Sequence, residues 1–231
     1  MPDVTSLHHR SDDRTSSAPA RSSGVPAPGG QPWSRGVVAL VASVLLGGLT
    51  SFAQGGVLPD AVAPFANSAS GWTLLTTLLV AWAARNPRTR TGHAAVLGAA
   101  SFLLLTLGYA VAADLRGYFY DPTTFGVVGL VVGPFVGVAA AWLGRTGVHA
   151  ALGTAVLAGI GVGESVYGLT TVVETTGATY WVAIGAVALV LLAAMLARRV
   201  RGAAPATIAV AGTALAAGAF VVAYRALGTI G

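Results

Sequence analysis

Seven stretches of mainly apolar residues follow one another along the chain, separated by short segments that carry most of its charged residues. Each stretch is close to the roughly 20 residues that an α-helix needs to cross the hydrocarbon core of a bilayer. The pattern therefore predicts an all-α polytopic membrane protein, a bundle of seven transmembrane helices within residues 36–231. The seven stretches cover residues 36–53, 68–84, 92–113, 125–143, 147–169, 180–196 and 205–227.

Composition supports the same class. Only 9% of the residues are charged and 55% are hydrophobic, with a mean hydropathy of +0.74. A soluble domain carries about 25% charged residues. The chain also contains no cysteine, which excludes disulfides, thiolate metal sites and a cysteine nucleophile.

The polar segment 1–35 has almost no apolar content, so it predicts a disordered cytoplasmic tail. The first apolar stretch has two interpretations. One is a cleaved signal sequence, because Ser51-Phe52-Ala53 resembles a small-x-small cleavage site. The long polar lead and the apolar run as far as Phe52 favour an uncleaved helix.

All of the basic side chains are arginines, and they alternate between successive connections. Arg35 and the turns at 85–90, 145 and 198–201 fall on one side of the seven-helix topology. The other side holds Asp60, Asp114, Asp121 and Glu174, with Arg116 and Arg225. The positive-inside rule places the N-terminus in the cytoplasm and the C-terminus outside. Basic residues that are all arginine, with much Ala, Gly and Val, indicate a GC-rich bacterial coding bias, so the expected membrane is the plasma membrane of a bacterium. Topology explains the net charge of +5 better than nucleic-acid binding does.

Small residues recur every fourth position in two neighbouring stretches, 125–143 and 147–169. In lipid, such ridges let two helix backbones approach closely. Because the turn at 144–146 is short, we expect the two ridges to face each other. The ridge residues are Gly129, Gly133, Gly137 and Ala141 in the first stretch, and Ala155, Gly159 and Gly163 in the second.

Glu164 is the only carboxylate well inside an apolar stretch. It lies roughly 25 Å along the helix from Gly147, near the outer surface. Ionisable groups at this depth are costly and face a cavity or a partner. Two hypotheses follow. Glu164 is a ligand or proton site, or it is an interfacial group paired with Arg116 or hydrogen-bonded to a tyrosine.

Other polar and aromatic residues gather on the same outer side, mainly in the segment 55–72 and at the ends of the third and fifth stretches. A polar recess lined by aromatic rings is a common form of small-molecule site. The alternative is a polar network that closes the bundle without a ligand. The candidate ligand-binding residues are Asp60, Asn67, Trp72, Tyr109, Asp114, Arg116, Glu164 and Tyr167.

No catalytic residue, metal site or cofactor is predicted. Ser68-Ala-Ser70-Gly71 resembles the Gly-x-Ser-Gly element of rhomboid proteases, but its first glycine is replaced. His93 and His149 begin their stretches on the opposite side, out of reach of a serine nucleophile. An acid–base pair of Glu164 and Asp114 is left as a third hypothesis, after a solute-binding protein and a structural or interaction protein. The expected partners are the lipid bilayer, with a small-molecule ligand and a membrane-protein partner or second copy left open, and no nucleic acid.

The segment 58–72 also carries a resemblance, together with Gly108-Tyr109 and the segments 114–118, 132–134 and 163–168. These residues resemble an uncharacterised family of multi-pass membrane proteins from high-GC Gram-positive bacteria. The resemblance covers about residues 37–200 and implies no activity. It implies that the outer-side residues are features of the family.

Overall fold

The computed structural model describes residues 32–54, 56–59, 61, 63–85 and 90–228. The chain divides into two units, Met1–Gly30 and Gln31–Gly231, and every described residue belongs to the second. The predicted tail therefore lies outside the described residues except for its last four, which open the first helix. Asp60 also lies outside them.

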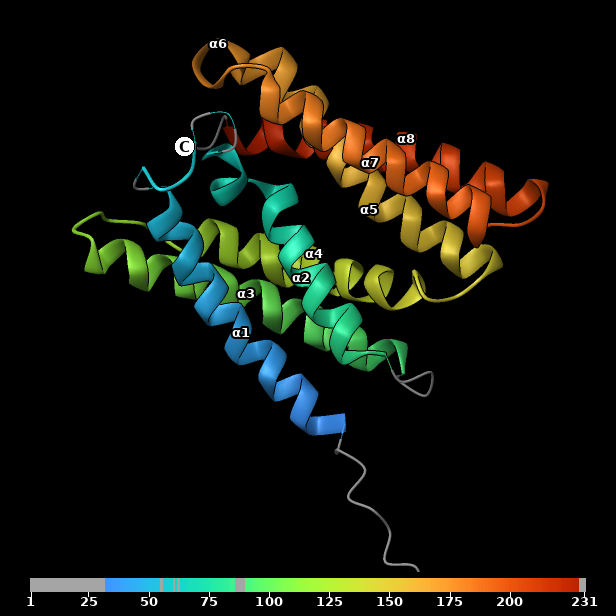
Figure 1. Ribbon diagram of the computed structural model, residues 1–231, viewed down its shortest axis with the longest axis horizontal. Coiled ribbons are helices and arrows are strands. Elements are labelled where there is room, and N and C mark those ends of the chain that lie inside the picture. The colour runs from blue at the N-terminus through green and yellow to red at the C-terminus, as the bar shows by residue number, and fades with distance from the viewer. Residues whose placement is uncertain (1–31, 55, 60, 62, 86–89, 229–231) are drawn as a thin grey trace, which may run out of the picture. The chain divides into compact units, whose positions relative to one another are not determined.

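The described residues form helices and no strand, so the all-α class is confirmed. A 3₁₀-helix, η1 (Ala63–Asn67), precedes α2, while a π-helical turn, η2 (Gly168–Val172), and α6 (Val173–Thr176) follow α5. Seven longer helices lie within three or four residues of the predicted stretches (Figure 1). They are α1 (Pro32–Ala53), α2 (Ala69–Ala83), α3 (Thr91–Leu115), α4 (Thr123–Trp142), α5 (Gly147–Tyr167), α7 (Thr179–Arg198) and α8 (Ala203–Gly228).

Six of these helices are long and apolar enough to cross a membrane. The exception is α2, whose 15 residues extend about 22 Å at 1.5 Å per residue. That is less than the hydrocarbon core of about 30 Å. The coarse prediction of a multi-pass bundle is thus supported, and the seventh crossing stays a prediction.

The helices pack in two groups, which are joined by the contact of α4 with α5 and by α2. In one group α3 packs against α1 and α4, and in the other α5 packs against α8 and α7. α2 contacts α1, α3 and α4, and it also touches α5. Figure 1 shows α5, α7 and α8 side by side, with α1 and α3 on the far side of α2.

The prediction that the two small-residue ridges face each other is wrong. Gly133 and Gly137 on α4 lie against Gly98 on α3, where an added Cβ would collide with backbone atoms. Gly159 and Gly163 on α5 lie against α8 instead. A short turn makes α4 and α5 neighbours but does not choose the faces that meet. Their contact uses other residues: Gly153 on α5 lies against Ala139 on α4, and Val136 and Leu157 pack in the same core cluster.

We call the two ends of the bundle the arginine-rich end and the acidic end. At the arginine-rich end the turn after α4 is tied to the turn after α7. The Gly147 N–H donates to the Arg199 carbonyl at 3.0 Å, and Arg199 Nη1 donates to the Gly144 carbonyl at 3.1 Å. Among the described residues, the charged side chains of this end are all arginines. The opposite end carries every acidic side chain of the described residues, namely Asp114, Asp121, Glu164 and Glu174.

Candidate functional site

α2 begins inside the bundle, below the acidic end. Near its C-terminus, Val80 shares a core cluster with Ala94 at the start of α3 and Ala140 near the end of α4. The end of α2 and the start of α3 therefore lie at a common level at the arginine-rich end. From that level α2 extends about 22 Å, whereas α3, with 25 residues, extends about 37 Å. The chain that precedes α2, including η1, fills the remaining depth.

A helix that begins at this level needs partners for its first four backbone N–H groups, since lipid offers none. Glu164 on α5 supplies two of them. Its Oε1 accepts from the Ala69 N–H at 2.8 Å, and its Oε2 accepts from the Ser70 N–H at 2.7 Å. The side chain is only 3% exposed. A carboxylate at a helix N-terminus also meets the positive end of the helix dipole, which stabilises its charge.

Ser68, the N-cap of α2, accepts from a third one of these N–H groups. Its Oγ accepts from the Gly71 N–H at 2.8 Å, and its carbonyl accepts the first helical hydrogen bond, from the Trp72 N–H at 3.1 Å. The same Oγ lies 2.5 Å from the hydroxyl of Tyr180, near the start of α7. The beginning of α2 is therefore fastened to α5 through Glu164 and to α7 through Ser68.

Glu164 does not pair with Arg116, a pairing that was one of the alternatives left open by the sequence. Arg116, which follows α3, instead donates from Nη1 to the carbonyl and the hydroxyl of Ser51 near the end of α1. Its guanidinium also lies over the rings of Phe52 and Tyr118, at 5.7 and 5.1 Å from their centroids. The sequence did not indicate the partner of Glu164, because every residue except proline has a backbone N–H group.

Next to Glu164 a cavity of about 710 Å³ opens at the acidic end, and we call it the recess. It is bounded by the chain before α2 and by α5 to α8. Its lining combines a carboxylate, amides, hydroxyls and three aromatic rings, as the sequence predicted for such a site. The lining residues are Gln54, Ala63, Pro64, Asn67, Glu164, Tyr167, Val172, Thr175, Thr176, Trp181 and Tyr224.

The recess contains three of the eight predicted site residues: Asn67, Glu164 and Tyr167. Asp114 is exposed at the end of α3 and is not part of the lining. The structure therefore does not bring Asp114 and Glu164 together as an acid–base pair. Arg116 braces α1, as described above, and Asp60 lies outside the described residues.

The remaining two, Trp72 and Tyr109, belong to an aromatic cluster between α2, α3 and α4. The Trp72 ring lies 5.5 Å from that of Tyr109, 6.1 Å from that of Phe102 and 5.9 Å from that of Phe125. Both residues are buried, and the Trp72 Nε1–H donates to the Ala66 carbonyl at 3.2 Å. They hold α2 and η1 in place and do not line the recess.

Several recess residues lay outside the predicted set. Trp181 lies near the start of α7, and Tyr224 lies near the end of α8. Because successive helices run in opposite directions, their positions in the sequence could have placed both residues at the acidic end. Thr175 and Thr176 follow the π-helical turn, which no sequence pattern indicated. The Trp181 Nε1–H donates to Thr176 Oγ1 at 2.8 Å, which fixes the ring.

Two ionisable groups in the connection between α3 and α4 have shifted pKa values. Burial raises the pKa of Tyr120, and the nearby Tyr109 and Asp121 raise it further, so its hydroxyl stays neutral. Hydrogen bonds from Thr123, one of them from its N–H at 2.9 Å, lower the pKa of Asp121. Asp121 is fully exposed and carries a negative charge at neutral pH.

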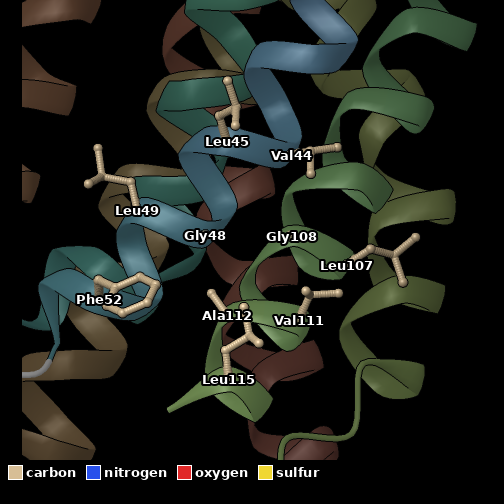
Figure 2. Close-up of a pocket in the computed structure, with 10 residues that line it drawn as sticks. All are labelled: Val44, Leu45, Gly48, Leu49, Phe52, Leu107, Gly108, Val111, Ala112 and Leu115. Carbon is tan, nitrogen blue, oxygen red and sulfur yellow. The ribbon is translucent and has the colours of Figure 1, made fainter.

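A second cavity, of about 460 Å³, is a groove between α1 and α3. Figure 2 shows its lining, with Leu49 and Phe52 on α1 and Val111 and Leu115 on α3. Its side chains are aliphatic or aromatic and carry no hydrogen-bonding group, so the groove cannot select a polar solute. Among the described residues, no group of three or more His, Cys, Asp or Glu side chains is placed to hold a metal ion.

Comparison with known proteins gives a family but no activity. Residues 26–229 match the model of a "Family of unknown function (DUF6518)", and the chain belongs to this family. No curated protein and no solved structure matches the chain. The resemblance to an uncharacterised family is supported to this extent, while the bacterial source stays a prediction.

We expect Glu164→Gln to lower the melting temperature of the purified protein in detergent. A glutamine has one acceptor oxygen, so one buried N–H of α2 is left without a partner, at a cost of roughly 1–3 kcal/mol. Ser68→Ala, which removes the N-cap, should cost about 1 kcal/mol. Glu174→Gln is the matched control, because Glu174 is exposed on α6. An equal melting temperature for Glu164→Gln and Glu174→Gln would contradict the assignment.

Proposed function

We propose that this chain is a seven-helix membrane protein that binds a small solute in the recess, as a receptor or as part of a translocation pathway. The observation that carries the proposal is the placement of the recess beside Glu164. A cavity of about 710 Å³ is within the range of small-molecule sites, roughly 300–1,000 Å³. Its mixed polar and aromatic lining suits a small polar compound.

The orientation that we propose makes the recess open to the outside. Among the described residues, the charged side chains at one end of the bundle are all arginines. The positive-inside rule assigns that end to the cytoplasm. In this arrangement α2 and the chain before it together form the seventh crossing. The N-terminus is then cytoplasmic, the C-terminus extracellular and the membrane the plasma membrane of a bacterium.

A structural or interaction protein without a ligand is the second candidate, and one observation favours it. Both oxygens of Glu164 already accept hydrogen bonds from α2. The polar groups near the recess would then serve only to satisfy buried backbone. The two candidates differ in whether any solute stabilises the protein.

Filling the recess tests solute binding. A library of small metabolites is screened by thermal stability, and a compound present at about 100 times its dissociation constant should stabilise the protein by about 2.7 kcal/mol. Ala63→Trp places a large ring in the recess and should abolish the stabilisation. Ala61→Trp is the control, because Ala61 is exposed two residues away and does not line the recess. A screen without any stabilising compound favours the structural role.

Single cysteines test the orientation, since the chain has none of its own. Phe119 is 93% exposed at the acidic end, and Thr146 is exposed at the arginine-rich end. On intact cells a membrane-impermeant maleimide should label Phe119→Cys, and it should label Thr146→Cys only after the membrane is opened. The reverse pattern would overturn the orientation.

A further inference from the structure

The charge of the recess indicates what kind of solute it selects. Glu164 is the only acidic or basic residue, among Asp, Glu, His, Lys and Arg, in the described lining. No arginine contributes to that lining. Arg116 is engaged with Ser51 and two aromatic rings, as described above. A solute that enters the recess therefore meets one buried carboxylate and no cation.

The carboxylate keeps acceptor capacity after it has capped α2. Two carboxylate oxygens offer about four lone-pair sites, and the N–H groups of Ala69 and Ser70 take one site on each oxygen. The positive end of α2 offsets about half of an elementary charge. Lone pairs on both oxygens therefore remain available beside the recess.

Three aromatic rings in the lining add a second cation-attracting feature. The rings of Tyr167 and Tyr224 meet edge to face at 5.1 Å, and Phe220 stacks on Tyr224 at 4.7 Å. Trp181 is fixed by its hydrogen bond to Thr176. Ring faces attract ammonium and guanidinium groups, and rings that are already held in place lose little freedom when a ligand binds.

The surface around the recess has the same sign. The acidic end carries Asp114, Asp121 and Glu174 on exposed positions, against Arg116 and Arg225. Apart from the buried Glu164, the described residues of this end hold three acidic and two basic side chains, a difference of one negative charge. Such a surface raises the local concentration of cations near the opening.

We propose that the solute of the recess is a small organic cation, an ammonium or guanidinium compound whose charge pairs with Glu164 among the rings of Tyr167, Trp181 and Tyr224. This inference rests on the proposed function, because it names the chemical class of the same solute. It also explains why a buried carboxylate and aromatic rings line one cavity.

The test compares cations with neutral molecules of the same shape. Choline is paired with 3,3-dimethylbutan-1-ol, guanidinium with urea, and methylammonium with methanol. The full chain in detergent is examined by thermal stability and by isothermal titration calorimetry. We expect at least one cation to bind at least tenfold more tightly than its neutral counterpart, and its binding to weaken as salt is added.

Variants at two positions locate the binding site, and those at Tyr167 leave the cap of α2 intact. Glu164→Gln should abolish the preference for the cation, but it also removes a structural contact. Tyr167→Leu removes a ring while leaving Glu164 in place. It should weaken the binding of the cation by roughly 2- to 30-fold, the change in affinity that corresponds to the range of cation–π energies. Tyr167→Phe keeps the ring and should bind the cation as the unaltered protein does.

The outcomes separate the two proposals. If neutral compounds bind as tightly as their cationic counterparts and Ala63→Trp abolishes that binding, the solute site stands and the cation inference is overturned. If Tyr167→Leu binds the cation unchanged, the aromatic part of the inference is overturned. If nothing in the paired series or the wider library binds, the proposed function fails and the inference fails with it.

Discussion

The structure depends on how α2, whose first turn is buried, satisfies its first backbone N–H groups. An unpaired N–H in such a place costs several kcal/mol. Here Glu164 and Ser68 provide acceptors for the N–H groups of the first three residues of α2, two through the carboxylate and one through the serine hydroxyl. This arrangement allows a short helix to begin in the interior of the bundle. The recess lies at the acidic end, beside the start of α2.

The same carboxylate connects the two helix groups of the bundle. Glu164 lies on α5, its hydrogen bonds hold α2, and Ser68 joins α2 to Tyr180 on α7. A solute that pairs with Glu164 therefore acts on the group that fixes the start of α2. Under the proposed function, solute binding and the position of α2 are linked, and each changes the free energy of the other.

Hydrophobic patterning predicted the helices well, because the length of an apolar stretch and the positions of arginines follow directly from bilayer thickness and topology. It also placed Asn67, Glu164 and Tyr167 on one side of the bundle, and all three line the recess. It did not predict which faces meet. The small residues of α4 pack on α3 and those of α5 pack on α8, because helix packing depends on tertiary contacts that a turn length does not encode. The partner of Glu164 was likewise hidden, since any residue type can supply a backbone N–H.

Amide hydrogen exchange at Ala69 and Ser70, resolved by NMR in selectively labelled protein, tests the central claim most directly. If Glu164 accepts both N–H groups, these two amides exchange slowly in the unaltered protein. In Glu164→Gln at least one should exchange tenfold faster or more, while the amides of Thr76 and Thr77, further along α2, stay slow. Fast exchange at both positions in the unaltered protein, or rates that Glu164→Gln leaves unchanged, would contradict the account.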